Sequence, residues 1–289
     1  MSDTNTPHTI VIKVGGGEGI DPTNLTSEIA ELTRSGIRVV LVHGGSHETN
    51  VLAEALGHPT QTITSPGGQQ SRRTDRTTLE IFEMVYCGKV NKAVVESLRA
   101  AGVDAIGLSG IDAGIWTGSR KSAIRAVDEE GRTFIVRDDL SGRVESVDAA
   151  FLETIMSLGR VPVLTPPAIT PDGIAINVDA DRAAAATAAA LNADELLLLS
   201  NVPGLLRDHT DAGSLIESVD AEGIEVARDA AKGRMKNKVL AAEEAITGGV
   251  SRVVIGSAGG DHPIASARAG RGTTFSSTIR NLSTQQVNA

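Results

Sequence analysis

The chain has 289 residues, of which 40% are apolar and 2% aromatic, and its formal net charge is −9. This length accommodates about two domains, or one large α/β domain with a sizeable core. The acidic balance argues against a broadly basic nucleic-acid surface, and the few aromatic residues leave little for base stacking. The single cysteine, Cys87, excludes an intramolecular disulfide and a cysteine-rich zinc site.

The sequence carries no pattern that targets a membrane. Its first residues, MSDTNTPHT, lack the charged and then apolar pattern of a signal peptide. No apolar run approaches the ~18 residues that a membrane-spanning helix needs. We therefore expect a cytoplasmic protein with neither a membrane nor a nucleic-acid partner.

The first part of the chain alternates short apolar runs with segments of helical periodicity. Strands are expected at 9–14 and 37–42, each ending in glycines, and helices at 25–35 and 46–57. Strand, helix, strand and helix in this order are typical of a parallel sheet covered on both faces by helices. Residues 64–70 are expected to form a loop.

The middle of the chain predicts two helices, followed by strands. Apolar residues at helical spacing indicate helices at 75–85 and 90–101, followed by a strand at 104–109. Within 120–147, two apolar runs flank a Glu-Gly turn, which indicates an antiparallel hairpin. A further strand at 161–165 ends at two prolines.

The last part of the chain begins a fresh helix and strand series. The expected elements are an Ala-rich helix from 179 to about 192, a buried strand at 195–200, a Pro-Gly turn at 203–204, a polar segment at 210–232, a helix at 236–248, a strand at 252–255 and a disordered tail at 276–289. A boundary near residue 175 would divide the chain into two lobes, 1–175 and 176–289, within one continuous sheet.

Two strand ends carry glycine turns. Lys13 lies in the first strand, just before Gly15–Gly17, and the second strand is followed by His43-Gly44-Gly45-Ser46. Ligands bind beyond the carboxyl ends of parallel strands, and glycines let backbone N–H groups approach an anion, so the pair of turns favours an anion site. Each turn alone is also compatible with an ordinary strand-to-helix turn, and Lys13 with an ammonium that reaches water. No P-loop motif is present, and GGGEG at 15–19 matches the dinucleotide fingerprint only weakly.

Three further clusters could carry chemistry. Asp179 and Asp181 begin a predicted helix, where capping is the simpler interpretation for both, although Asp181 could also reach a lysine. Four cations within 232–238 lie at a helix start, where they oppose the helix dipole and therefore favour an anionic ligand. Arg72, Arg73 and Arg76 suit carboxylate or phosphate binding as well as surface ion pairing. His43 is equally compatible with stabilising its turn and with catalysis.

In their order along the chain, these segments resemble the amino acid kinase superfamily. The resemblance spans about residues 9–275 and rests on the following segments: Lys13 with its glycines, HGG at 43–45, SRRTD around Arg72, LEIFEMVYCGKVNK at 79–92, NVDAD at 177–181, LLLLSNVPGLL at 196–206 and GRMKNKV at 233–239. Within the superfamily, the chain is similar to the acetylglutamate kinase branch. It most resembles the LysZ-type kinases, which phosphorylate aminoadipate or glutamate carried on the small acidic protein LysW. Ser46, in place of a third glycine, favours this carrier-dependent group.

The resemblance implies a fold and a reaction. The fold is a three-layer αβα sandwich with a central, mainly parallel sheet, in which lobe 1–175 binds the amino-acid substrate and forms a homodimer and lobe 176–289 binds the nucleotide. ATP, with Mg²⁺ bridging its phosphates, would phosphorylate a side-chain carboxylate to an acyl phosphate in lysine and/or arginine biosynthesis. No side-chain metal site is expected. Because a carboxylate is already ionised at pH 7, such a reaction needs no general base.

The resemblance also implies residue roles. Lys13 and Lys238 would stabilise the transferring phosphoryl group, and Asp181 would hold both lysines. Backbone N–H groups of Gly16, Gly44 and Gly45 would bind phosphoryl oxygens and substrate. The residues expected to bind the substrate are Gly44, Gly45, Ser46, Arg72 and Asn177. Those expected to bind the nucleotide are Gly15, Gly16, Ser200, Asn201, Val202, Pro203, Gly204 and Lys236.

An acidic carrier would need a local basic surface on this acidic protein. Arg73 and Arg76 are the candidates, together with cations of the predicted hairpin that are equally compatible with a solvated surface: Arg120, Lys121, Arg125 and Arg137. Three alternatives stay open: a kinase for free N-acetylglutamate, a kinase for a related carrier-bound amino acid, and a non-catalytic regulatory homologue that binds an amino acid.

Overall fold

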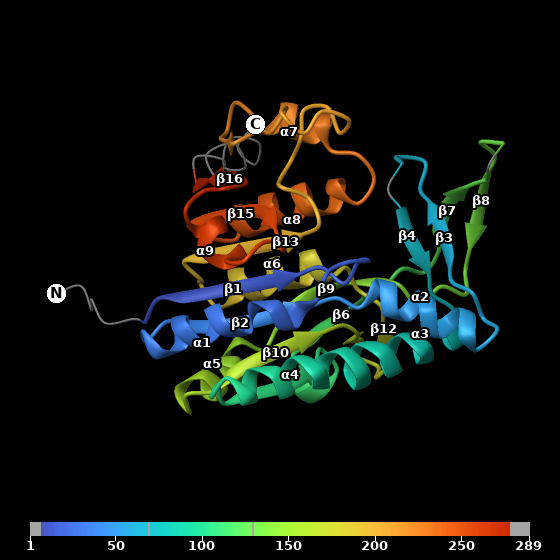
Figure 1. The fold of residues 1–289 in the computed structure, drawn as a ribbon. Coiled ribbons are helices and arrows are strands. Elements are labelled where there is room, and N and C mark those ends of the chain that lie inside the picture. Colours follow the sequence, from blue (N-terminus) through green and yellow to red (C-terminus); the bar gives the residue numbers. More distant parts are fainter. Residues whose placement is uncertain (1–6, 69, 129, 278–289) are drawn as a thin grey trace, which may run out of the picture.

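A computed structural model describes residues 7–68, 70–128 and 130–277. A sheet of eight strands crosses the molecule in the order β14-β16-β15-β13-β1-β2-β10-β5 (Figure 1). Its strands are β1 (Thr9–Val14), β2 (Arg38–His43), β5 (Ala105–Ser109), β10 (Val161–Thr165), β13 (Glu195–Ser200), β14 (Ser218–Val219), β15 (Arg252–Ser257) and β16 (Thr273–Ser276). Neighbouring strands are parallel except β15 and β16. The mainly parallel central sheet is therefore confirmed.

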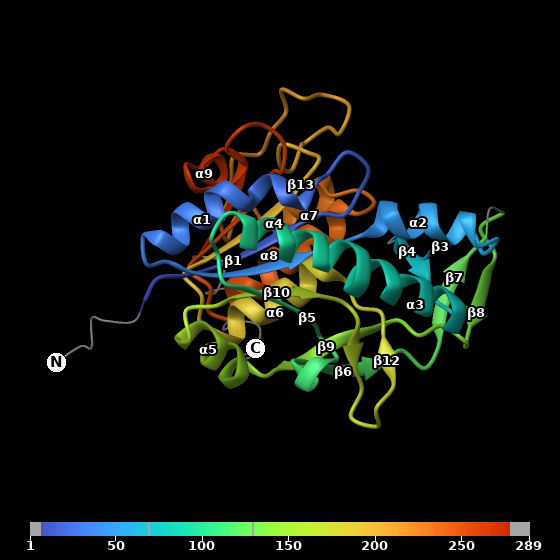
Figure 2. The same ribbon diagram turned by 60° about the horizontal axis from the view of Figure 1, so that its bottom comes forward.

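Helices cover both faces of this sheet, because side chains alternate along each buried strand. Ile10 and Ile12 of β1 pack with α1 (Thr26–Arg34), α3 (Arg76–Glu83), α4 (Asn91–Ala100) and α9 (Pro263–Arg268). Val11 packs with α5 (Ala149–Ser157), α6 (Ala180–Ala190) and α8 (Met235–Thr247) on the opposite face. Figure 2 shows α1 and α4 lying over the strands. The three-layer αβα arrangement is thus confirmed.

Two small sheets complete the fold. One consists of β12 (Ala175–Ile176), β11 (Ala168–Ile169), β6 (Trp116–Arg120) and β9 (Gly142–Val147). The other projects at one end of the molecule and consists of β4 (Gln70–Arg73), β3 (Gln61–Thr64), β7 (Ile124–Val127) and β8 (Thr133–Val136) (Figure 1). Strands β7 and β8 form the hairpin predicted within 120–147.

Several sequence expectations differ from the structure. Thr64 and Gln70, the two ends of the expected loop, belong instead to β3 and β4, and Ile63 of β3 packs with Ala126 and Val136 in a small core. The helices expected at 75–85 and 90–101 are joined through a π-helical segment, η2 (Met84–Val90). The polar segment 210–232 contains β14 and α7 (Ile224–Ala230). Ser276, expected to begin the tail, ends β16, and residues 278–289 lie outside the described residues.

The remaining elements are α2 (Ser46–Ala55), η1 (Pro22–Leu25) and η3 (Asp112–Gly114). The main sheet continues across residue 175, because β1 pairs directly with β13. The division into two lobes at that residue stays a prediction. None of the helices in the described ranges combines the length and apolar character that crossing a membrane requires.

A buried hydrogen bond joins one small sheet to the helical layer and generates a stability prediction. The fully buried Trp116 donates its indole N–H to Thr187 Oγ1 of α6 at 2.9 Å. Thr187→Val leaves that N–H unpaired and should lower the free energy of unfolding by about 1–3 kcal/mol. Urea denaturation measures the loss, with Thr154→Val on the exposed side of α5 as the matched control. Equal losses in both variants would contradict the role assigned to this bond.

Candidate active site

Two glycine turns meet at the carboxyl edge of the main sheet. Val14 and His43 are partners in the parallel register of β1 and β2, so the turns that follow them are neighbours. A Cβ on Gly16 would overlap the backbone nitrogen of Gly45, which explains why glycine is needed at this crossing. The Ser46 hydroxyl donates to the Gly16 carbonyl at 2.9 Å and fastens one turn to the other.

The backbone N–H groups of these turns differ in availability. Gly44 N donates to Val14 O at 3.1 Å, so this amide is already paired, and the ligand-binding role expected for it stays a prediction. The Gly45 N–H acts as a hydrogen-bond donor toward the Tyr86 hydroxyl and favours its ionised form. Within the described residues, no acceptor pairs with the Gly16 N–H. Of the three backbone N–H groups, that of Gly16 is therefore the one available to a ligand in the described structure.

Lys13, Asp181 and Lys238 form a buried charge cluster from three elements. Lys13 lies on the face of β1 that α6 covers, and Asp181 lies in the first turn of α6. The Lys13 ammonium is 2.7 Å from Asp181 Oδ1, and the Lys238 ammonium of α8 is 2.9 Å from Asp181 Oδ2. The three residues are only 6%, 7% and 8% exposed. The structure thus brings together all three residues expected to be catalytic.

The cluster holds one more positive than negative charge. Burial opposes ionisation of Asp181, but attraction to the two lysines outweighs it and holds the pKa of this carboxyl well below its ordinary value. Burial likewise opposes charge on Lys13, and attraction to Asp181 prevails, so the pKa of Lys13 is raised. Burial, with repulsion from Lys13, lowers the pKa of Lys238. Two ammonium groups against one carboxylate favour a bound anion.

Asp179 holds the cluster in place from the helix terminus. Its Oδ1 accepts the backbone N–H groups of Asp181 and Arg182, each at 3.0 Å, as an N-cap does. Its Oδ2 accepts from Asn237 Nδ2 at 2.8 Å and so connects α6 to α8. Capping is therefore confirmed for Asp179. For Asp181 the capping interpretation is wrong, because its carboxylate forms ion pairs with Lys13 and Lys238.

Arg72 lies beside the second glycine turn. One of its terminal nitrogens, Nη2, donates to Ser46 O at 3.1 Å, while Nη1 is buried with no hydrogen-bond partner in the described part of the chain. Burial, with repulsion from Arg234, lowers the pKa of Arg72. A buried donor without an acceptor is costly, so this position suits an anionic ligand. Asn177 donates to Thr74 Oγ1 at 2.9 Å, which places it near the strand that carries Arg72.

The residues expected to bind nucleotide are only partly brought together. Gly15 N donates to Leu199 O at 2.9 Å, which places the first turn next to the end of β13. There the Ser200 hydroxyl is buried and has no partner among the described residues. Gly204 packs inside, against Leu215 and Thr273. Asn201 and Pro203 are exposed and Val202 is half-buried.

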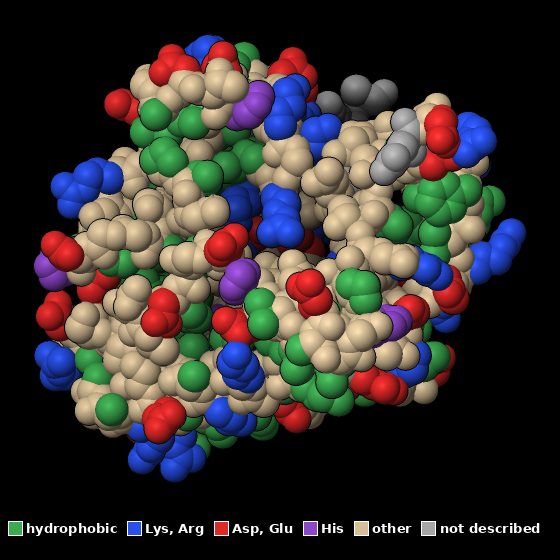
Figure 3. Space-filling model, turned by 45° about the vertical axis from the view of Figure 1, so that its right-hand side comes forward, with side chains coloured by type: hydrophobic (Ala, Val, Ile, Leu, Met, Phe, Trp, Pro, Cys, Tyr) green, Lys and Arg blue, Asp and Glu red, His purple; other side chains and the backbone are tan. Residues whose placement is uncertain are grey.

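Lys236, two residues before Lys238, takes part in a different contact from that of the buried charge cluster. Its ammonium donates to Gly67 O at 2.8 Å, in the turn between β3 and β4. The contact connects the start of α8 to the projecting small sheet. Figure 3 shows a hollow on this side of the molecule with Lys and Arg side chains at its rim. Cations therefore gather locally on a chain whose net charge is −9.

Sequence reasoning assigned no role to Tyr86. This residue lies in the π-helical segment, and its ring stacks on Phe82 with centroids 3.7 Å apart. A Cβ on Gly45 would come within 3.0 Å of the same ring. Burial raises the pKa of Tyr86, while Arg72 and Lys13 act against that rise. The one available signal was that the chain's single tyrosine falls within the run at 79–92.

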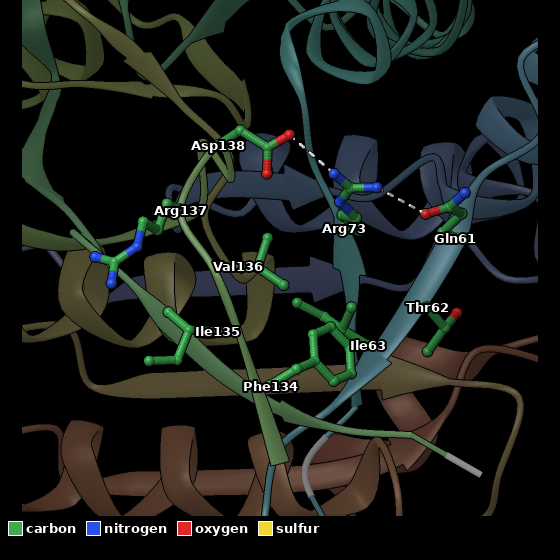
Figure 4. Close-up of a pocket in the computed structure, with 9 residues that line it drawn as sticks. All are labelled: Gln61, Thr62, Ile63, Arg73, Phe134, Ile135, Val136, Arg137 and Asp138. Carbon is green, nitrogen blue, oxygen red and sulfur yellow. Dashed lines mark hydrogen bonds and ion pairs between the residues drawn. The ribbon is translucent and has the colours of Figure 1, made fainter. Parts of the chain in front are cut away.

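A separate hollow of about 760 Å³ lies on the small sheet of β3, β4, β7 and β8. Figure 4 shows Arg73 at its edge, between Gln61 and Asp138. Arg73 donates to Gln61 Oε1 at 3.0 Å and to Asp138 Oδ2 at 2.8 Å, so its charge is already paired. Arg76, at the start of α3, is exposed. Of the two arginines expected to meet a carrier, Arg76 alone forms no such pair with the described residues.

Comparison with known proteins agrees with this geometry. A family model described as "Amino acid kinase family" matches residues 8–257. The chain is 54% identical over 267 residues to LysW-aminoadipate kinase of Deinococcus radiodurans, which covers 92% of this chain and 91% of the relative. It is 50% identical over 266 residues to LysW-aminoadipate kinase of Thermus thermophilus, covering 91% and 98%. N-acetylglutamate synthase from Neisseria gonorrhoeae, solved with coenzyme A and N-acetyl-glutamate, shares the fold with a TM-score of 0.75 at 25% identity, covering 93% of this chain and 59% of that one. From a family match over most of its length and from these identities, the chain belongs to the amino acid kinase family.

Proposed function

We propose that this protein transfers the γ-phosphoryl group of MgATP to the side-chain carboxylate of aminoadipate attached to an acidic carrier protein. The buried cluster of Lys13, Asp181 and Lys238 carries the proposal, because it places net positive charge beside the glycine turns. The names of the two relatives at 54% and 50% identity support carrier-bound aminoadipate as the acceptor. The intact charge cluster argues against a non-catalytic homologue.

The proposed reaction places two anions next to each other. A carboxylate oxygen of the acceptor forms a bond to the γ-phosphorus while the bond to the β,γ-bridging oxygen breaks, which yields an acyl phosphate and ADP. The two lysines offset the repulsion between the reactants and stabilise charge on the transferring group. Asp181 stays ionised, since its pKa is held low, and it positions both ammonium groups rather than accepting a proton.

We place the two substrates at buried side-chain groups that have no hydrogen-bond partner among the described residues. The unpaired Arg72 Nη1, with Asn177 nearby, would bind the amino-acid side, and the unpaired Ser200 hydroxyl would bind the nucleotide. Mg²⁺ would enter with ATP and offset part of the negative charge of its phosphates. On the resemblance alone, we also propose a homodimer formed through the lobe at 1–175.

Removing either lysine should abolish most of the activity. We expect Lys13→Met and Lys238→Met each to lower kcat about 100-fold or more, because the loss of one charge donor at a transferring group costs about 3–4 kcal/mol. Lys89→Met, at an exposed lysine of η2, is the matched control and should keep its kcat. Circular dichroism checks that each variant is folded. An undiminished kcat for Lys13→Met would refute the catalytic role of the cluster.

The acceptor can be identified by trapping the product. With ATP, Mg²⁺ and hydroxylamine, an acyl phosphate yields a hydroxamate. We expect the hydroxamate with carrier-bound aminoadipate and none with free N-acetylglutamate. Carrier-bound glutamate, shorter by one methylene, should react with a kcat/KM lower by about 10–200-fold if the pocket fits aminoadipate. Hydroxamate formation from free N-acetylglutamate would favour the arginine-pathway alternative.

Docking of an acidic carrier should depend on Arg76. Arg76→Glu is expected to raise the KM for carrier-bound substrate several-fold at low salt and to leave kcat unchanged, because a rim charge acts mainly on encounter. The difference in KM between Arg76→Glu and the unmodified protein should shrink as salt screens the charges. Arg99→Glu, at an exposed arginine near the end of α4, is the control. A KM that is equal for Arg76→Glu and the unmodified protein would remove Arg76 from the carrier interface.

A further inference from the structure

His43 is a buried titratable group that the proposed reaction does not use. It is 0% exposed, at the end of β2, directly before Gly44 and Gly45. Its ring lies between two partners: Nδ1 is 3.0 Å from Gly44 O, and Nε2 is 3.1 Å from Asn91 Nδ2. Asn91 opens α4 and is 1% exposed. The His43 ring is thus enclosed by protein on both of its polar sides.

The partners determine which ring nitrogen carries the proton. Gly44 O can only accept, so Nδ1 must donate to it. Asn91 presents its amide nitrogen, because that nitrogen also donates to Val163 O at 3.0 Å and Asn91 Oδ1 accepts from Lys92 Nζ at 3.1 Å. Turning the amide over would place Oδ1 against the Val163 carbonyl. Nε2 is therefore the acceptor, and the ring is the neutral Nδ1–H tautomer.

The charges around His43 keep it neutral. Burial lowers its pKa to about 4, the Gly44 carbonyl acts in the opposite direction, and repulsion from Lys13 and Lys92 lowers it further. Tyr86, the other titratable ring nearby, has its centroid 6.5 Å away. Between pH 6 and 8 the hydrogen bond to Gly44 is therefore expected to persist unchanged.

The bond to Gly44 O also determines where Gly45 N–H points. The two groups belong to one planar trans peptide, so they point in opposite directions. A peptide between two glycines meets little steric resistance to rotation. Holding the carbonyl toward His43 therefore keeps the Gly45 N–H turned toward its acceptor, the Tyr86 hydroxyl.

We propose that His43 is a positioning residue: held as its Nδ1–H tautomer by Asn91, it fixes the Gly44–Gly45 peptide so that the Gly45 amide meets the Tyr86 hydroxyl and the second turn keeps its place against Gly16. The inference rests on the proposed phosphoryl transfer and adds a residue pair that acts through the backbone. His43 exchanges no proton with substrate in this role. Asn91 contributes by donating a hydrogen bond to Nε2, which keeps that nitrogen unprotonated.

Two substitutions at His43 separate positioning from packing. Asn can place its side-chain nitrogen where Nδ1 lies, whereas Leu cannot donate. We expect His43→Leu to lower kcat at least about tenfold with the KM for MgATP little changed, and His43→Asn to recover most of that loss. The Gly45 amide NMR resonance should shift in His43→Leu and return toward its original position in His43→Asn. His209→Leu, at an exposed histidine, is the control and should change neither quantity.

The ¹⁵N NMR shifts of the His43 ring nitrogens report the tautomer directly. This measurement does not depend on which substrate accepts the phosphoryl group. The unmodified protein should show a neutral Nδ1–H ring for His43 throughout pH 6–8. In Asn91→Asp, a carboxylate facing Nε2 should raise the pKa of His43 and give kcat a new titration in that range. A Nε2–H ring or an imidazolium in the unmodified protein, or full kcat in His43→Leu, would overturn the proposal. Failure of the proposed function itself would appear separately, as absent hydroxamate from the unmodified enzyme.

Discussion

The sharing of one buried carboxylate by two buried ammonium groups is the constraint on which the rest of the site depends. Isolated charges at this depth would be strongly destabilising, so Lys13 and Lys238 can stay charged only while Asp181 remains between them. The three residues come from β1, α6 and α8, far apart in sequence. Their meeting therefore requires the whole sheet and its covering helices to be in place.

The surrounding structure meets this requirement mainly through backbone geometry. Asp179 caps α6 and bonds Asn237, so the helix that carries Asp181 and the helix that carries Lys238 are held at their termini. The two glycine turns cross so closely that a side chain at Gly16 would overlap the backbone of Gly45 in the other turn. The glycine turns thus lie at the carboxyl edge of a parallel sheet, where ligand binding is expected for this architecture, and Lys13 of the buried charge cluster belongs to the strand that leads into the first turn.

Much of the fold could be predicted because its central strands are continuous apolar runs. Strands such as Thr9–Val14 and Glu195–Ser200 are buried along their whole length, so they stand out from their polar flanks. Apart from the hairpin of β7 and β8, the short strands of the small sheets could not be predicted in this way. The 64–70 region shows why: Ile63 is a single apolar residue whose partners, Ala126 and Val136, are more than sixty residues away. The π-helical segment likewise has no sequence periodicity of its own.

The sequence by itself determined the residue types of the site, the order of its motifs and their resemblance to one family, because these depend only on which residues follow one another. Only the tertiary structure decided which polar groups are paired. It assigns Asp179 to capping and Asp181 to the lysines, pairs Arg73 with Asp138, and leaves Arg72 Nη1 and the Ser200 hydroxyl without partners among the described residues. It also shows that a chain of net charge −9 holds a buried excess of positive charge. The physical reason is that pairing and burial depend on contacts between distant segments, which a sum over the sequence does not contain.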